Sequence, residues 1–305
     1  MSGTVNWILY NKSNITGESE RGRMRIVFAT DLSDANEAAI ESRTCLECLD
    51  NIGVREVHLL TVVPDNVSSG LPGMEAATDA KEALAPQRRV FERAGFDVET
   101  HVARGTPHRR INGLAERVDA DMIVVGSRGE APLRNRLIGG TVRNVARTAV
   151  RPLLVERIEE TPDGHAVRKE HLFQNVLYAT DFSENAARAY DFFPALTGAT
   201  ERASLLHVGG RGDSASRVDA EERLDELASD LHDRMGIDVE TSVRSGNPVE
   251  EITAEEERVG ATTTLIGARG TSRLRRLLLG STAESIVARG TNNVLLVPPE
   301  ATPSR

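Results

Sequence analysis

The two halves of this 305-residue chain carry the same sequence pattern, which restricts the fold to a tandem duplication. Residues 97–107 align without a gap with residues 238–248, at an offset of 141 residues. Two further pairs of segments match: Ile123–Gly129 with Thr264–Gly270, and Val27–Ser33 with Leu177–Ser183. The last pair lies at an offset of 150 residues, so the second copy has lost nine residues. We place this loss in the loop after its second strand.

Short apolar runs alternate with longer amphipathic stretches in both copies. In the first copy the expected strands are Arg25–Thr30, Val57–Val63, Val98–Ala103, Met122–Gly126 and Pro152–Val155, and the expected helices are Asp34–Leu49, Asp79–Ala94, His108–Val118 and Thr141–Thr148. In the second copy the expected strands are Asn175–Thr180, Ser204–Val208, Val239–Arg244, Thr263–Gly267 and Val294–Val297. Several strands are apolar throughout, as expected when helices cover both faces of a sheet. The pattern predicts an α/β fold with two tandem open parallel-sheet, Rossmann-like, doubly wound domains.

The repeats set the expected domain boundaries. Repeat 1 covers residues 24–156 and repeat 2 covers residues 172–299. The charged segment 157–171, which contains Pro162 and Gly164, is expected to be the linker, and residues 300–305 a short tail. Residues 1–23 belong to neither repeat. They are expected to be a disordered extension, with an ordered arm and a start at Met24 as the alternatives.

Charge and hydropathy exclude several classes of partner. The net charge is −9, with 46 acidic and 37 basic residues, and aromatic residues make up only 4%. Both values argue against a nucleic acid partner. The apolar runs are far shorter than the roughly 20 residues of a membrane span, so no membrane insertion is expected. No basic and apolar leader of the secretory type is recognisable, and a cytoplasmic protein is expected.

Glycine-rich loops follow the fourth expected strand of each repeat. In repeat 2 the loop reads Gly267-Ala-Arg-Gly270, then nine residues, then Gly280-Ser281-Thr282 at the start of a helix. In repeat 1 it reads Gly126-Ser-Arg-Gly129, nine residues, and Gly139-Gly140-Thr141. Ligands of open parallel sheets bind beyond the carboxyl ends of the strands. A helix N-terminus there is a natural seat for phosphate oxygens.

With this loop pattern the chain resembles the universal stress protein family in its tandem form. The resemblance covers about Arg25–Pro298. It also rests on Thr-Asp-x-Ser after the first strand and Leu-Leu-x-Val in the second, at Thr30–Ser33, Thr180–Ser183, Leu59–Val62 and Leu205–Val208. One subgroup of the family binds ATP and carries the full glycine signature, which repeat 2 has intact. The resemblance therefore implies ATP as the ligand, with Mg²⁺ as a companion of its phosphates.

The same resemblance implies a set of binding residues in each repeat. In repeat 2, Asp181 and Val208 would hold the adenosine part, and the ribose and phosphates would be held by Gly267, Gly270, Gly280, Ser281 and Thr282. The matching positions of repeat 1 are Asp31, Val62, Gly126, Gly129, Gly139, Gly140 and Thr141. Gly140 departs from the family pattern of Ser or Thr, which removes a hydroxyl donor with a contribution of about 0.5–1.5 kcal/mol. Thr141 compensates if the helix start shifts by one residue. We expect binding in repeat 2 and weaker or no binding in repeat 1.

Each of these residues also has an ordinary structural interpretation. Asp31 and Asp181 are of a type that caps helices and turns, and Gly129 and Gly270 are of a type that forms sharp turns. The arginines within the nine-residue inserts either clamp phosphates or a partner or are solvated: Arg134, Arg136, Arg273, Arg275 and Arg276. The segments Gly105–Pro107 and Gly246–Pro248 are interpreted as turns before a helix, with a ligand role as the alternative.

Cysteine and histidine usage indicates no metal site. Cys45 and Cys48 lie on one face of an expected helix and are interpreted as packed, reduced thiols. The seven histidines show no metal-ligand spacing, and His58 and His207 are interpreted as structural residues of strands.

Three functions remain open at this point. A nucleotide-binding regulatory module is favoured over a slow ATPase or phosphotransferase, because the loops contain neither a lysine nor a histidine that would serve phosphoryl transfer. A nucleotide-free interaction scaffold is the third. The two repeats are expected to form an intramolecular pseudo-dimer through their last strands, Pro152–Glu156 and Asn293–Val297. A further homodimer, the protein partner and the regulated process cannot be read from the sequence.

Overall fold

The fold is described from a computed structural model. The described residues are 23–41, 43–63, 75–127, 139–161, 164–168, 171–210, 214–270 and 279–300. Gly129, the five insert arginines and most of residues 1–23 lie outside these ranges. Within the described part of the chain, every helix is too short or too polar to span a lipid bilayer.

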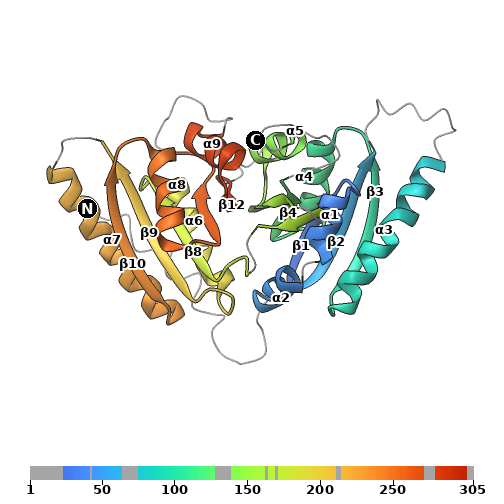
Figure 1. Ribbon diagram of the computed structural model, residues 1–305, viewed down its shortest axis with the longest axis horizontal. Coiled ribbons are helices and arrows are strands. Elements are labelled where there is room, and N and C mark those ends of the chain that lie inside the picture. Colours follow the sequence, from blue (N-terminus) through green and yellow to red (C-terminus); the bar gives the residue numbers. More distant parts are fainter. Residues whose placement is uncertain are drawn as a thin grey trace.

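Both repeats form the predicted alternation of strands and helices (Figure 1). Repeat 1 contains β1 (Met24–Thr30), α1 (Asp34–Glu41), α2 (Arg43–Asn51), β2 (Val54–Val63), α3 (Glu75–Arg93), β3 (Asp97–Arg104), α4 (Pro107–Arg117), β4 (Met122–Gly126), α5 (Gly140–Thr148) and β5 (Leu153–Glu156). Repeat 2 contains β8 (Asn175–Thr180), α6 (Glu184–Tyr190), the 3₁₀ helix η1 (Phe193–Leu196), β9 (Arg202–Gly209), α7 (Ser214–Met235), β10 (Asp238–Ser245), α8 (Pro248–Val259), β11 (Thr263–Gly267), α9 (Ser281–Arg289) and β12 (Asn293–Val297).

The strands of both repeats join into one ten-stranded sheet. Its order is β10-β9-β8-β11-β12-β5-β4-β1-β2-β3, so both repeats use the same order of strands. All neighbours are parallel except β12 and β5, which pair antiparallel in the middle, with Leu295 opposite Leu154. The last strands of the repeats therefore meet as predicted. We call this strand pair the junction.

Alternate residues of the strands enter two different cores. Ile26 and Phe28 of β1 pack into a core with α1, α2, α3, α6 and α7, whereas Val27 packs into a core with α4, α5, α8 and α9. This alternation places helices on both faces of the sheet. Leu154 and Leu295 of the junction belong to the first core, so the apolar interior is continuous from one repeat to the other.

The predicted place of the nine-residue loss is partly wrong. Strand register pairs Ala29 with Leu60 in repeat 1 and Ala179 with Leu206 in repeat 2. Four residues are therefore lost before the second strand, where η1 stands in place of α2, and five are lost after it. The expected single helix Asp34–Leu49 is also divided into α1 and α2.

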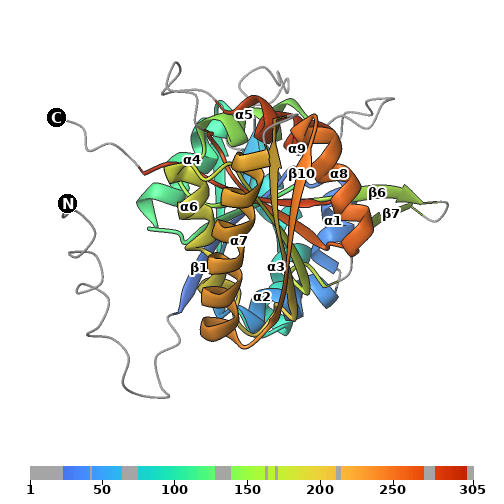
Figure 2. The same cartoon turned by 90° about the vertical axis from the view of Figure 1, so that its left-hand side faces the viewer.

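The segment between the repeats carries a β-hairpin that the sequence did not predict. Its strands are β6 (Ile158–Thr161) and β7 (Gly164–Val167), paired antiparallel. Figure 2 shows the hairpin projecting beside α1 of repeat 1. Ile158 and Val167 pack against Ala35 of α1, which ties the hairpin to that repeat.

Arg157, directly before the hairpin, is buried against repeat 2. Its guanidinium donates hydrogen bonds to the carbonyl oxygens of Ile286, Val287 and Asn292 at 2.6–2.8 Å. Two of these carbonyls lie in the last turns of α9. Burial lowers the pKa of Arg157 to about 10, and the group remains charged at neutral pH. Cations at a helix C-terminus are stabilising, so Arg157 fixes α9 from the linker.

Candidate functional site

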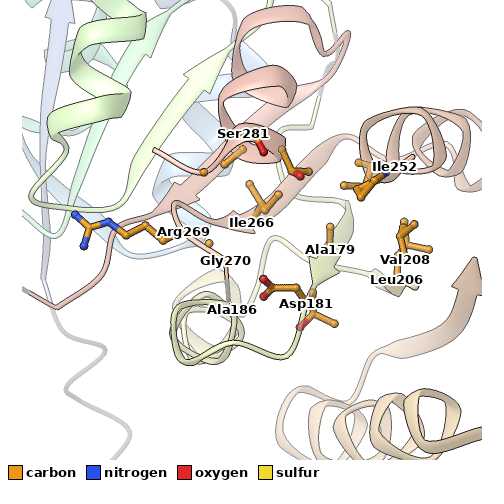
Figure 3. A pocket seen from close by; sticks show the side chains of 16 residues that line it. Ala179, Asp181, Ala186, Leu206, Val208, Ile252, Ile266, Arg269, Gly270 and Ser281 are labelled. Carbon is orange, nitrogen blue, oxygen red and sulfur yellow. The ribbon is translucent and has the colours of Figure 1, made fainter. Parts of the chain in front are cut away.

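A pocket opens at the carboxyl ends of the repeat 2 strands (Figure 3). It holds about 810 Å³ of atom-free space, a volume that includes space open to solvent. Its lining residues are Ala179, Thr180, Asp181, Ala186, Leu206, Val208, Pro248, Ile252, Ile266, Gly267, Arg269, Gly270, Gly280, Ser281, Thr282 and Ala283. The pocket lies where the connections from β8 and β11 leave the sheet, the place where doubly wound folds bind ligands.

The structure brings together all seven residues predicted for repeat 2. Strand and loop ends contribute Asp181, Val208, Gly267 and Gly270, and the beginning of α9 contributes Gly280, Ser281 and Thr282. They come from four separate parts of the chain, which the parallel sheet collects at one edge.

Apolar side chains form a large part of the wall. Leu206 comes from β9, Ile252 from α8 and Ile266 from β11 (Figure 3). Sequence reasoning did not single out these residues or Arg269. Pro248 belongs to the segment Gly246–Pro248, which was interpreted as a turn with a ligand role as the alternative, and it lies in the lining. The wall thus combines apolar side chains with a few polar groups.

Asp181 takes part in a turn and also faces the pocket. Its Oδ1 accepts a hydrogen bond from the Ser183 N–H at 3.1 Å, and Ser183 in turn caps α6 by accepting from the Ala186 N–H. Phe182 between them has a φ of 57°, the left-handed region that tight turns use. The structural interpretation of Asp181 therefore holds for one carboxylate oxygen. The other oxygen, Oδ2, faces Gly270.

Close approach, rather than an unusual backbone angle, requires glycine at position 267 and leaves little room beside Gly270. A Cβ on Gly267 would lie 2.9 Å from the backbone carbonyl of Asn185 at the start of α6, and one on Gly270 would overlap Asp181 Oδ2. Asn185 holds this edge together. Its Oδ1 accepts from the Arg269 N–H at 2.7 Å and its Nδ2 donates to the Val297 carbonyl at 3.1 Å.

The N-terminus of α9 opens onto the pocket. Gly280 is the N-cap residue; its N–H donates to the Ala268 carbonyl and its carbonyl accepts from the Glu284 N–H, both at 2.8 Å. Among the described residues no side chain caps this helix. The first N–H groups of α9 and the Ser281 hydroxyl therefore stand at a positive helix end, which attracts an anion.

Repeat 1 has the same helix start without the hydroxyl. Gly139 is the N-cap residue and α5 begins at Gly140. In repeat 2 the N-cap residue is Gly280 and α9 begins at Ser281. The helix start has not shifted, so Thr141 corresponds to Thr282 and does not take the place of Ser281. The compensation considered from the sequence is not what the structure shows.

The surroundings of Asp31 and Gly126 also differ from those in repeat 2. Asp31 Oδ1 accepts hydrogen bonds from the Ser33 N–H, the Ser33 hydroxyl and the Asn36 amide at 2.5–3.1 Å. A Cβ on Gly126 would overlap Asn36 Oδ1 and lie 2.8 Å from Ile158 Cδ1 of the hairpin. The side chains of Asn36 and Ile158 therefore occupy the space beside Asp31 and Gly126 at this edge of repeat 1. Val62 is half-buried at the end of β2.

Of the two cysteines, the structure describes the side chain of Cys48. It is buried in α2 as a free thiol, and burial, more than any other influence, raises its pKa. A protonated, buried thiol agrees with the interpretation as a packing residue.

Comparison with known proteins gives matches over most of the chain. The model of the universal stress protein family matches residues 22–157 and again residues 172–298. The universal stress protein Slr1230 of Synechocystis is 28% identical over 278 residues, which cover 90% of this chain and 89% of that protein. The universal stress protein MJ0577 of Methanocaldococcus jannaschii is 25% identical over 153 residues, or 43% of this chain and 93% of that protein.

A solved structure resembles both repeats together. The crystal structure of a universal stress protein from Archaeoglobus fulgidus superposes with a TM-score of 0.70 and 27% identity, covering 90% of this chain and 98% of that one.

Proposed function

Since the chain belongs to the universal stress protein family and carries two such domains in tandem, we propose that it is a nucleotide-responsive regulatory module. Repeat 2 binds ATP in the pocket described above. Repeat 1 binds it more weakly or not at all. Occupancy of repeat 2 stabilises that repeat and alters the surface it presents to a protein partner.

The observation that carries the proposal is the convergence of the seven predicted residues on one pocket. The apolar wall with Leu206, Val208 and Ile252 suits the flat face of adenine. Asp181 supplies a carboxylate for a ribose or adenine donor. Ser281 and the N-terminus of α9 supply donors for phosphate oxygens. A nucleotide has this same sequence of apolar, polar and anionic parts.

Regulation is favoured over efficient turnover by the chemistry of the lining. Phosphoryl transfer needs a base or positioned nucleophile and cations around the transferred group. Asp181 and Arg269 are the charged residues of the lining, and Asp181 already holds the turn before α6. Mg²⁺ would accompany ATP through phosphate oxygens and water ligands.

Nucleotide release on heat denaturation of the purified chain, together with thermal unfolding at increasing ATP–Mg²⁺, tests the proposal. A ligand at 100 times its Kd stabilises the state that binds it by about 2.7 kcal/mol. We expect a clear rise in Tm that Ser281→Ala and Asp181→Ala reduce. Thr141→Ala, the matched change at the equivalent helix of repeat 1, should leave the rise nearly intact.

Three other outcomes would each contradict the proposal. An unchanged Tm at saturating ATP would point to a nucleotide-free scaffold. An equal loss on Thr141→Ala would show that repeat 1 contributes as much to binding as repeat 2. Steady release of phosphate that disappears in Asp181→Ala would favour the slow ATPase.

A further inference from the structure

Three side chains of the types that bind metal ions meet on β2 and β3 of repeat 1, the repeat for which weaker nucleotide binding or none is proposed. They are His58, Glu99 and His101, and one ligand atom from each lies within 4.8 Å of the others. We call them the histidine cluster. Strand β3 is the last strand of the ten-stranded sheet, so the cluster lies at the outer edge of repeat 1 (Figure 1).

Strand register creates the cluster. His58 pairs directly with Glu99 across the two parallel strands, and His101 lies two residues further along β3. Because side chains alternate along a strand, Glu99 and His101 point to the same face. The two histidines are 43 residues apart in the chain, which is why sequence spacing gave no sign of a metal site and His58 was interpreted as structural.

The distances suit a small metal ion. His58 Nδ1 lies 2.9 Å from His101 Nε2, and it lies 3.6 Å from Glu99 Oε2. His101 Nε2 lies 3.7 Å from Glu99 Oε1. Ligand atoms about 2.0–2.1 Å from a tetrahedral ion are separated from one another by roughly 3.3 Å. The three observed distances bracket this value. The two that involve Glu99 end on different carboxylate oxygens, so an ion is bound once the exposed Glu99 side chain turns one oxygen toward both histidines.

The ring of His58 is already oriented for metal binding. It is 3% exposed, and its Nε2 lies 2.9 Å from Glu56 Oε1. Glu56 is held in turn by Arg25 at 3.0 Å. A carboxylate accepts, so Nε2 carries the proton and Nδ1 directs its lone pair toward His101 and Glu99. A carboxylate behind a ligating histidine is the usual arrangement in metal sites.

The positions of repeat 2 that are equivalent to the histidine cluster carry other side chains. Register places Ser204 opposite Glu240, as His58 stands opposite Glu99, and Ser242 in the place of His101. There the Ser204 hydroxyl donates to Glu240 at 2.9 Å, and Arg258 neutralises the same carboxylate at 2.9 Å. Repeat 1 keeps the carboxylate and has two imidazoles in place of two hydroxyls. This difference turns an ordinary surface interaction into a set of metal ligands.

We propose that the histidine cluster is a binding site for a divalent transition-metal ion of the Zn²⁺ type, with His58 Nδ1, His101 Nε2 and a Glu99 oxygen as ligands. Two imidazoles and one carboxylate favour such ions over Mg²⁺ and Ca²⁺. The Glu99 side chain is 66% exposed, which leaves the fourth position open to water. The ion joins the edge strand β3 to β2 and stabilises repeat 1. The site does not depend on the nucleotide pocket.

Metal titration of the full chain tests this proposal. The protein, prepared without a polyhistidine tag and stripped with a chelator, is titrated with Zn²⁺ against a chromogenic zinc indicator. We expect one ion per chain and a rise in Tm. The double variant His58→Ser/His101→Ser reproduces the side chains found in repeat 2, and it should lose both effects. His108→Ser, a histidine of α4 outside the cluster, should keep them.

A second pair of variants keeps the test valid if the double variant fails to fold. Glu99 and Asp97 both point to the same face of β3, and their side chains are 66% and 71% exposed. Glu99→Gln should weaken Zn²⁺ binding at least about tenfold. Loss of a residue that only hydrogen-bonds a metal ligand already lowers metal affinity by about that factor, and Glu99 is itself a proposed ligand. Asp97→Asn should not. Equal Zn²⁺ affinity of Glu99→Gln and the unmodified chain, or no stoichiometric binding by the latter, would overturn the proposal.

Discussion

The residues of the repeat 2 pocket differ in how much change they tolerate, and Gly267 tolerates least. The atoms that a methyl group would meet belong to the backbone of Asn185 and cannot rotate away. Gly267→Ala should therefore lower the free energy of unfolding by about 1–3 kcal/mol, the usual effect of overpacking, and weaken ATP binding by displacing α6. Urea unfolding and calorimetric titration measure the two effects.

A matched control for Gly267 lies in α4. Nothing stands within 4 Å of a Cβ on Gly113, and alanine favours helices over glycine by about 1 kcal/mol. Gly113→Ala should leave stability unchanged or raise it. A Gly267→Ala protein as stable as Gly113→Ala would show that the contact with Asn185 is easily relieved.

The hydroxyl difference between the two helix starts leads to a reciprocal exchange. Ser281→Gly should weaken ATP binding to repeat 2 by about 2- to 10-fold, the effect of one lost hydrogen bond. Gly140→Ser should strengthen binding to repeat 1, because it adds the hydroxyl donor that Ser281 supplies in repeat 2. A Cβ at this position meets open space, so the serine fits. Calorimetric titration of each variant gives the affinity and the number of sites. If Gly140→Ser leaves repeat 1 unable to bind, the closed edge around Asn36 and Ile158 decides the asymmetry instead.

Much of the pocket could be predicted from the sequence, because its glycines and Asp181 form a short local pattern that recurs. The residues that were missed come from elsewhere. Ile252 reaches the pocket from α8, and Asn185 joins the Arg269 N–H to the Val297 carbonyl at the end of β12. Neither residue belongs to the local pattern. The histidine cluster is likewise absent from any local pattern. Glu99 and His101 lie on the strand next to that of His58, and only the register brings the three side chains together.

At the scale of elements, helix α8 carries two adjacent glutamates with opposite electrostatic roles. Burial acts to raise the pKa of Glu255, but hydrogen bonds from Arg258 and Arg244 outweigh it, and the net pKa lies below the usual 4.5. For Glu256, burial raises the pKa above 4.5, against the smaller influences of Thr264 and Arg157. One carboxylate is thus favoured as an anion in the folded state, and the other as a neutral acid.

These opposite shifts predict opposite pH dependences. Glu255 stabilises the fold above pH 4.5, and this contribution is lost as the pH falls through its lowered pKa. The contribution of Glu256 is full below pH 4.5 and is lost as the pH rises through its raised pKa. Urea unfolding should show Glu255→Gln destabilised by about 1–3 kcal/mol at pH 7 and less so in acid. Glu256→Gln should gain relative to the unmodified chain as the pH rises. Parallel pH profiles for the two variants would contradict this assignment.

Arg157 connects the linker to α9, and its loss should be felt across the chain. Arg157→Met removes the guanidinium donor from three carbonyl oxygens, of which that of Ile286 still accepts from the Gly290 N–H, and should cost about 1–3 kcal/mol. Arg168→Met, in the same linker but exposed and 4.0 Å from Glu159, should change stability by less than about 1 kcal/mol. Chemical unfolding compares the two. Equal effects would mean that Arg157 does not hold α9.

The elements of the sheet could be predicted well because strand and helix have different hydrophobic periods. The hairpin β6–β7 could not, since its strands are short and lie in a charged segment with Pro162 and Gly164. Its stability comes from packing of Ile158 and Val167 against α1. Such packing is a tertiary effect that leaves no periodic trace in the sequence.

At the scale of the whole molecule, the junction dominates. Leu153, Leu154, Val155 and their partners on β12 are fully buried, and burying each such side chain contributes about 1.5–3 kcal/mol. Repeat 1 expressed alone, ending at Glu156, exposes this strand edge. It should form a homodimer through two antiparallel β5 strands, as sedimentation would show. Leu154→Lys should yield monomers, whereas Glu92→Lys on α3 should not. A monomeric repeat 1 without either change would contradict this view.

The junction also decides how the protein behaves when it is scarce. Two separate chains that meet through one strand each come apart on dilution, so their assembly depends on how much protein a cell makes. Here both strands belong to one chain, and the short segment between the two repeats keeps the effective concentration of the strands high at any abundance. The two repeats stay paired even in a single molecule, and each pair always consists of one repeat 1 and one repeat 2. Because the pairing is guaranteed by the chain, a change in one repeat does not require the same change in the other.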